Sequence, residues 1–198
     1  MTYAHAEVAK NIKSVAVNKM SLQERGEKIL ARLNLPKSLD KYGETHLVGN
    51  IAFQTTVKPD IDIQIYALNS LWSKNSKKII KQFSDMGINK YEERDLKQSG
   101  KHLISFSYLD ESNTNWSIDI TQTEKNNNYL NDAYTFYLDT KNKMSPQKIE
   151  TIKHLKNYFY RKNKLKNSMS YYIYQAVLNK DVHTIDEMSQ FLIDNKYI

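Results

Sequence analysis

The stretch HLVGNIAFQTTVKPDIDIQIY, residues 46–66, ends in a strict alternation of polar and apolar side chains. A period of two is typical of a β-strand with two different faces. Asp60 and Asp62 share one face of this predicted strand with Gln64, and the isoleucines between them form the other face. A face made only of isoleucine indicates a central strand that packs against a core.

The two aspartates on one face have two interpretations. Carboxylates at positions i and i+2 of a strand stand side by side, and they repel each other unless a cation or a proton lies between them. This arrangement favours a metal site. The alternative is the solvent-facing side of a sheet, where the same pattern is common.

The segments on either side of this strand predict more strands in the middle of the chain and helices at both ends. A short apolar strand precedes it at residues 45–50, and a hairpin loop separates the last two of the three strands that follow. Those three strands are predicted at residues 90–97, 102–111 and 115–123.

Helix start signals place the helices. Ser21 with Glu24 forms a capping box for a helix that runs to Leu33, and Thr184 with Glu187 forms another. The pair Ser145-Pro146 fits an N-cap followed by proline at the first helical position. Further helices are predicted over residues 3–19, from Asn69 or Ser70 to Met86, and over residues 168–179.

Composition narrows the chemistry of the protein. Its 198 residues contain no cysteine, so any metal must be held by oxygen or by histidine. No apolar run approaches the roughly 18 residues of a membrane span, and the N-terminus has no secretory signal pattern, so we expect a cytoplasmic protein with no membrane partner. The net charge of +7 favours a polyanionic partner, although a solvated lysine-rich surface gives the same charge.

Three elements of the sequence together resemble the signature of the nucleotidyltransferase superfamily with the DNA polymerase beta-like fold. They are Gly49-Asn50 after the apolar pair Leu47-Val48, then Asp60-Ile61-Asp62-Ile63, and then the third acid, Asp119, in the stretch WSIDI at residues 116–120. The resemblance covers about residues 40–124. It implies an α/β (α+β) fold, in which helices flank a small mixed β-sheet and a C-terminal helical subdomain follows. We therefore expect a nucleotidyltransferase-like domain with N-terminal helices at residues 1–125, and the helical subdomain at residues 126–198.

The resemblance also implies a catalytic site. Asp60, Asp62 and Asp119 would be the catalytic and metal-binding residues, and their charge of about −3 would hold two Mg²⁺ ions, which prefer hard oxygen ligands. Asp119 would be the first candidate for the general base. Gly49 and Asn50 would cradle the phosphates of a nucleoside triphosphate. Lys58 would approach a phosphate, or else be an ordinary exposed lysine in a turn.

Asn50 departs from the family pattern, which has serine or glycine at this position. Its amide can donate a hydrogen bond to phosphate, but its greater bulk would weaken triphosphate binding. The departure therefore also fits a catalytically inactive relative.

The function that this resemblance implies is a magnesium-dependent nucleotidyltransferase. It would transfer a nucleoside monophosphate from a nucleoside triphosphate to a hydroxyl acceptor. A small-molecule acceptor is favoured over a protein, and nucleic acid is the least favoured, although the basic charge leaves it open. The alternative is a catalytically inactive module that binds nucleotide or a partner. A third reading, a basic nucleic-acid binder, predicts strong salt dependence, and the sequence has no basic-aromatic groove motif for it.

Overall fold

The computed structural model describes residues 20–125, 132–165 and 168–197, and the helix predicted over residues 3–19 lies outside them. Within the described residues, a five-stranded sheet has the order β1-β2-β5-β4-β3. Strands β2 and β5 are parallel, and the other neighbouring pairs are antiparallel, so the predicted mixed sheet is confirmed. The strands are β1 (Glu44–Val48), β2 (Asp60–Tyr66), β3 (Tyr91–Leu96), β4 (Lys101–Leu109) and β5 (Asn115–Thr123).

The isoleucine face of β2 lies in the core, as its alternation predicts. Ile61, Ile63 and Ile65 are each at most 1% exposed, and they pack with Ile118 and Ile120 of β5. Burying an aliphatic side chain of this size contributes about 1.5–3 kcal/mol. This face therefore fixes the register of the two central strands, and with it the direction of the polar side chains on the opposite face.

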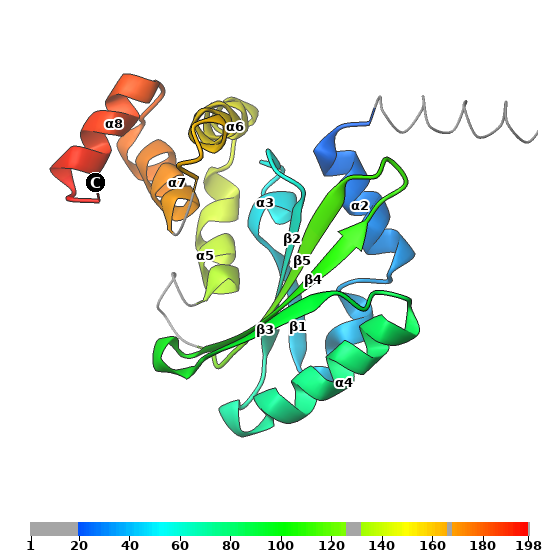
Figure 1. Ribbon diagram of the computed structural model, residues 1–198. Helices are drawn as coiled ribbons and strands as arrows, with labels where there is room; N and C mark the ends of the chain where they lie inside the picture. The colour runs from blue at the N-terminus through cyan, green and yellow to red at the C-terminus, as the bar shows by residue number, and fades with distance from the viewer. Residues whose placement is uncertain (1–19, 126–131, 166–167, 198) are drawn as a thin grey trace, which may run out of the picture.

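Helices cover both faces of the sheet (Figure 1). Helices α2 (Leu22–Arg32) and α4 (Trp72–Asp85) pack on the isoleucine face. The C-terminal helices share a second hydrophobic core of their own, to which Phe53 also contributes. They are α5 (Ala133–Thr140), α6 (Pro146–Arg161), α7 (Met169–Lys180) and α8 (Ile185–Asp194). None of the described helices combines the length and the apolar composition that a membrane crossing requires.

The division of the chain at residue 125 stays a prediction. The two hydrophobic cores lie on either side of it in the sequence, apart from Phe53. The expected boundary, however, falls next to residues 126–131, which lie outside the described part of the chain.

The helix start signals are confirmed at three helices and wrong at one. Both capping boxes are present, at Ser21 and Thr184, and Ser145 caps α6. Neither Asn69 nor Ser70 caps α4, because a 3-10 turn precedes that helix and Leu71 takes the cap position without a side-chain bond. The remaining short helices are α3 (Gly49–Ala52), η1 (Lys37–Tyr42), η2 (Asn69–Leu71), η3 (Lys97–Ser99) and η4 (Lys141–Lys143).

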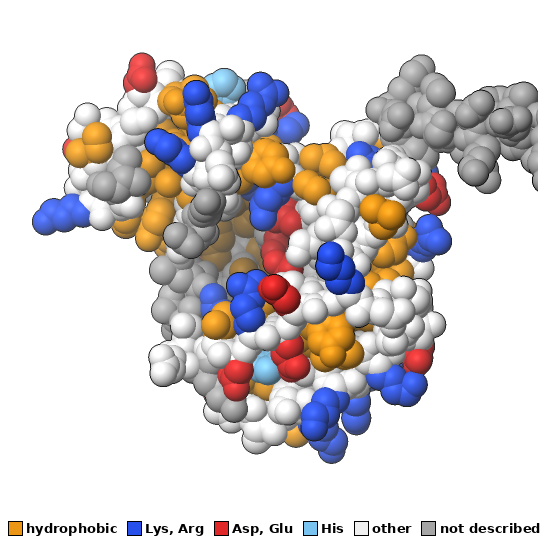
Figure 2. Space-filling view, viewed as in Figure 1, with side chains coloured by type: hydrophobic (Ala, Val, Ile, Leu, Met, Phe, Trp, Pro, Cys, Tyr) orange, Lys and Arg blue, Asp and Glu red, His pale blue; other side chains and the backbone are white. Residues whose placement is uncertain are grey.

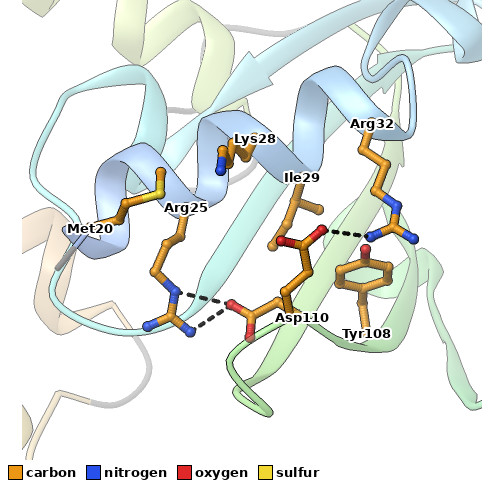
Figure 3. Close-up of a pocket in the computed structure, with 8 residues that line it drawn as sticks. Met20, Arg25, Lys28, Ile29, Arg32, Tyr108 and Asp110 are labelled. Atoms are coloured by element: carbon orange, nitrogen blue, oxygen red, sulfur yellow. Dashed lines mark hydrogen bonds and ion pairs between the residues drawn. The ribbon is translucent and has the colours of Figure 1, made fainter. Parts of the chain in front are cut away.

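A buried ion pair fastens α2 to the loop between β4 and β5. Figure 3 shows Arg25 pointing from α2 to Asp110, beside a cavity of about 240 Å³. The Arg25 guanidinium donates to Asp110 Oδ2 at 2.5 and 3.0 Å, and the two side chains are 14% and 8% exposed. The same carboxylate also accepts hydrogen bonds from the indole of Trp116 and from the backbone N–H groups of Ser112 and Thr114. The Asp110 carboxylate therefore holds the backbone of this loop in place and joins it to α2.

We expect Asp110→Ala to lower the free energy of unfolding by about 3 kcal/mol, because it leaves a buried guanidinium without its partner. Urea denaturation followed by circular dichroism measures the change. Glu111→Ala is the matched control, since the Arg32–Glu111 pair spans 3.5 Å between side chains that are more than 60% exposed. Its effect should stay within about 0.5 kcal/mol. Equal effects of the two substitutions would contradict the role assigned to Asp110.

Candidate active site

The parallel pairing of β2 and β5 brings the three predicted acids together. Asp62 is directly opposite Asp119, and Asp60 is opposite Ser117. Neighbours in register point to the same side of a sheet, so all three carboxylates lie on the face opposite the isoleucine core. Most of that face on β2 is closed to solvent, since Asp60 and Gln64 are 4% and 1% exposed as whole residues, whereas Asp62 and Asp119 are partly exposed. The alternative of a solvated sheet face is therefore wrong for this strand.

The carboxylate of Asp60 is held by two side chains of the protein. The Asn50 amide donates to its two oxygens at 2.9 and 3.1 Å, and the Lys58 ammonium lies 2.7 Å from Oδ2. Asn50 itself is 5% exposed, so its side chain faces the protein interior. The prediction that Asn50 and Lys58 bind phosphate stays a prediction, and both side chains contact Asp60 in this structure.

Lys156, on α6, is a charged residue of this site that the sequence analysis missed. Its side chain is completely buried, and its ammonium donates to the side-chain amide oxygen Oδ1 of Asn50 and lies 5.3 Å from the centre of the Tyr174 ring. A signal for it exists, because Lys156 lies between Ile152 and Phe159 on the apolar side of α6, and all three are buried. A lysine in an apolar stripe needs a polar partner, since burying an unpaired charge is costly.

The charges of the site act strongly on one another. Burial, together with the neighbouring carboxylates of Asp60 and Asp119, raises the pKa of Asp62 to about 8. Burial lowers the pKa of Lys156 to about 8, although Asp60 and Asp62 oppose this change. Burial also acts against the charge of Lys58, but the nearby carboxylates outweigh it and raise the pKa of that ammonium. Asp62 is therefore the carboxylate with the greatest need of a cation.

The raised pKa of Asp62 predicts a pH-dependent stability. The folded chain holds this proton up to about pH 8, whereas the unfolded chain releases it near 3.8. The contribution of Asp62 to stability is therefore fully present below pH 3.8 and is lost as the pH rises through 8. We expect Asp62→Asn to stabilise the metal-free protein more at pH 8 than at pH 5, by about 1 kcal/mol or more, since a tenfold change in a protonation equilibrium corresponds to about 1.4 kcal/mol.

Thermal unfolding in the presence of a chelator, at both pH values, measures this difference. Asp85→Asn is the control, because the Asp85 side chain is 64% exposed and lies away from the cleft. An Asp62→Asn effect that is equal at pH 5 and pH 8 would contradict the electrostatic account.

Gly49 brings the backbone close to Asp62. Its φ of +67° is in the left-handed region that glycine adopts readily. A Cβ atom at this position would lie 2.1 Å from Asp62 Oδ2, far inside van der Waals contact. The glycine of the predicted motif thus leaves the space that the Asp62 carboxylate occupies.

A cavity of about 440 Å³ opens beside Asp62, between the sheet and the C-terminal helices. Figure 2 shows a hollow between these two parts of the molecule, with acidic and basic side chains next to each other inside it. Its size is within the range of small-molecule sites. The sheet side is formed by Gly49, Asp62, Gln64 and Thr121 among others, and the helical side includes Phe136, Ser170, Tyr171 and Tyr174.

The residues of this site fit a metal ion in part. Among the described residues, no three His, Asp or Glu side chains form a ready-made metal cluster. Both carboxylate oxygens of Asp60 already have partners, which are the Asn50 amide and the Lys58 ammonium. Asp62 and Asp119 provide the hard oxygen donors that Mg²⁺ prefers. The carboxylates of Asp60 and Asp119 repel a negative charge on Asp62, which favours a cation beside it.

Solved structures of RNA-modifying polymerases are similar to this chain, whereas no protein-family model and no curated protein sequence matches it. A structure of Cid1, described by its RNA terminal uridylyl transferase activity, has a TM-score of 0.58 at 17% identity over 82% of this chain and 48% of its own. A mutant of the Cid1 poly(U) polymerase bound to MgATP has a TM-score of 0.56 at 17% identity, with coverage of 91% and 58%. A cytoplasmic RNA terminal U-transferase has a TM-score of 0.54 at 18% identity, with coverage of 82% and 50%.

These likenesses show that the chain has the nucleotidyltransferase fold, which confirms the prediction from its motifs. At this level of identity they concern the fold alone. The chain spans about half the length of the solved structures that it matches.

Proposed function

We propose that this protein is a nucleotidyltransferase that uses a nucleoside triphosphate as donor and transfers the nucleoside monophosphate to a hydroxyl group. The observation that carries the proposal is the position of Asp60, Asp62 and Asp119 on one face of two paired strands, next to Gly49 and a cavity. The fold and its similarity to nucleotide-bound polymerases support it. The site residues, the magnesium dependence and the acceptor are all parts of this proposal.

Four residues of the site have a proposed role in this reaction. Asp62 and Asp119 would hold Mg²⁺, which when bound neutralises phosphate charge and makes an acceptor hydroxyl easier to deprotonate. The Asp119 carboxylate would take the acceptor proton. The acceptor oxygen then forms a bond to the α-phosphorus, and pyrophosphate leaves with the electron pair of the broken bond. Gly49 would let the triphosphate approach the backbone closely, and Lys58 would donate to a phosphate oxygen once it has left Asp60.

For the acceptor, we propose a hydroxyl-bearing small molecule first. The cavity of about 440 Å³ beside Asp62 supports this choice, since it has the size of a site for one small ligand or nucleoside. A terminal hydroxyl of RNA is the second candidate, because the similar structure of Cid1 is described by RNA terminal uridylyl transferase activity. A protein hydroxyl is the third.

The direct test is transfer of label from nucleoside triphosphates that carry radioactive phosphorus at the α-position. The protein is incubated with Mg²⁺ and, in separate reactions, with a panel of hydroxyl-bearing small molecules, with short RNA, and with a protein mixture. We expect label in one acceptor class and pyrophosphate release in step with it, and neither with Asp62→Asn. Label transfer that persists at the wild-type rate in Asp62→Asn would contradict the proposed site.

The second candidate function is a catalytically inactive module that binds nucleotide. The engagement of Asp60 by Asn50 and Lys58 favours it, because this pairing removes one carboxylate from the metal site in the free protein. Calorimetric titration with each triphosphate separates the two functions. Binding that requires Mg²⁺ and is lost in Asp62→Asn supports the enzyme, whereas binding that is independent of both supports the module.

A further inference from the structure

Lys58 reaches from the surface onto a buried carboxylate. Its side chain is 37% exposed, while that of Asp60 is only 6% exposed, and the two charged groups are 2.7 Å apart. The backbone makes this possible, because the Asp60 N–H donates to the Lys58 carbonyl at 2.9 Å and so curls the chain back on itself. Asn50 fixes the same carboxylate from the other side. The pair is therefore built by the local chain path and by a buried amide.

The surroundings of Asp60 make this pair stronger than an exposed lysine–carboxylate contact. An exposed pair contributes about 0–1 kcal/mol, because water screens it and both side chains lose freedom. Asp60 is 4% exposed, and the Asn50 amide donates hydrogen bonds to its carboxylate. Among the described side chains, removal of Lys58 would leave this buried carboxylate with the Asn50 amide as its remaining contact. A buried carboxylate in that state attracts the next available cation.

The net charge of the site determines how many divalent ions it binds. The three carboxylates alone carry a charge of about −3, which matches two divalent ions together with the phosphates of a substrate. Lys58 and Lys156 both act electrostatically on this group. When Asp62 is ionised, as it would be beside a bound cation, three carboxylates and two ammonium groups leave one net negative charge, which one divalent ion already outweighs.

We propose that Lys58 is an internal counter-cation for Asp60, so that the free protein binds one divalent ion, at Asp62 and Asp119, and not two. This inference rests on the proposed function, since it takes these acids to be a metal site. The Lys58 ammonium holds the position beside Asp60 that a second ion would otherwise take. Lys58 is then a positioning residue that sets the ion count of the site.

The test counts Mn²⁺ ions on the full-length protein without nucleotide, with Mn²⁺ as a spin-active substitute for Mg²⁺. Free Mn²⁺ measured by electron paramagnetic resonance gives the number bound per chain, and circular dichroism checks that each variant is folded. We expect one ion in the wild type, two in Lys58→Met, and none in Asp119→Asn. Lys153→Met is the matched control, because Lys153 pairs with Glu150 on the exposed side of α6, and it should bind one ion.

The outcomes separate this inference from the proposed function. Two ions in the wild type, or one ion in Lys58→Met, would overturn the counter-cation role of Lys58. The label-transfer assay is independent of that count. Transfer by a wild type that binds two ions would leave the enzyme standing and remove only this inference, whereas absence of both Mn²⁺ binding and transfer would remove both.

Discussion

Gly49→Ala is expected to reduce nucleotidyl transfer by about 10²-fold or more, because it displaces the Asp62 carboxylate, which we propose holds the metal ion. The new Cβ would lie 2.1 Å from Asp62 Oδ2 and 2.8 Å from its Cγ, so the Asp62 side chain must move. A misplacement of about 1 Å in a reacting group is enough for an effect of this size. Initial rates of label transfer at saturating triphosphate measure it.

The chain offers a closely matched control in Gly100→Ala. Gly49 and Gly100 have the same φ of +67°, so both substitutions place alanine in the left-handed region at a similar cost of about 1–2 kcal/mol. A Cβ on Gly100, however, meets no atom within 4 Å. We expect Gly100→Ala to lose some stability and keep its transfer rate. Full activity in Gly49→Ala would mean that the position of the Asp62 carboxylate does not matter to the reaction.

Asp119→Asn is expected to reduce transfer by about 10³-fold or more. The substitution removes the proposed metal ligand and the proposed proton acceptor together, and each of these contributes several kcal/mol to such reactions. Because asparagine has nearly the same shape as aspartate, the strand pairing of Asp119 with Asp62 should survive. Thermal unfolding checks that the fold is intact, and the label-transfer rate measures the loss.

A graded comparison comes from Ser117, whose hydroxyl donates to Asp119 Oδ1 at 2.7 Å. Ser117→Ala leaves the carboxylate in place and removes only its support. Loss of such a supporting hydrogen bond typically reduces activity or metal affinity by about 10–100-fold. Ser117→Ala should therefore lie between the wild type and Asp119→Asn. If Ser117→Ala were as damaging as Asp119→Asn, the role of Asp119 as ligand and base would need revision.

Much of the fold was predictable because the relevant signals are local. The alternation over residues 60–66 defines both faces of β2, and the capping residues Ser21, Ser145 and Thr184 define three helix starts. The pairing of Asp62 with Asp119 is a long-range contact, and it was predictable only through the resemblance to a known motif. The start of α4 was not predictable from Asn69 or Ser70, because a 3-10 turn replaces the side-chain cap there.

The electrostatics of the site could not be predicted from sequence. Lys156 meets Asn50 across a separation of 106 residues, and no local pattern couples α6 to that turn. The sequence offers Lys58 as a phosphate-binding candidate, but its contact with Asp60 depends on how the chain between the two residues curls back. The sequence therefore predicts three negative charges, whereas the folded site also holds two buried or half-buried ammonium groups.

Crystals grown with Mn²⁺ would locate the ion by its anomalous scattering. We predict a peak within about 2.3 Å of carboxylate oxygens from both Asp62 and Asp119, on the side of the sheet away from the isoleucines. A well-ordered site with no manganese beside these two residues, or with their carboxyl groups on opposite sides of the sheet, would contradict the account.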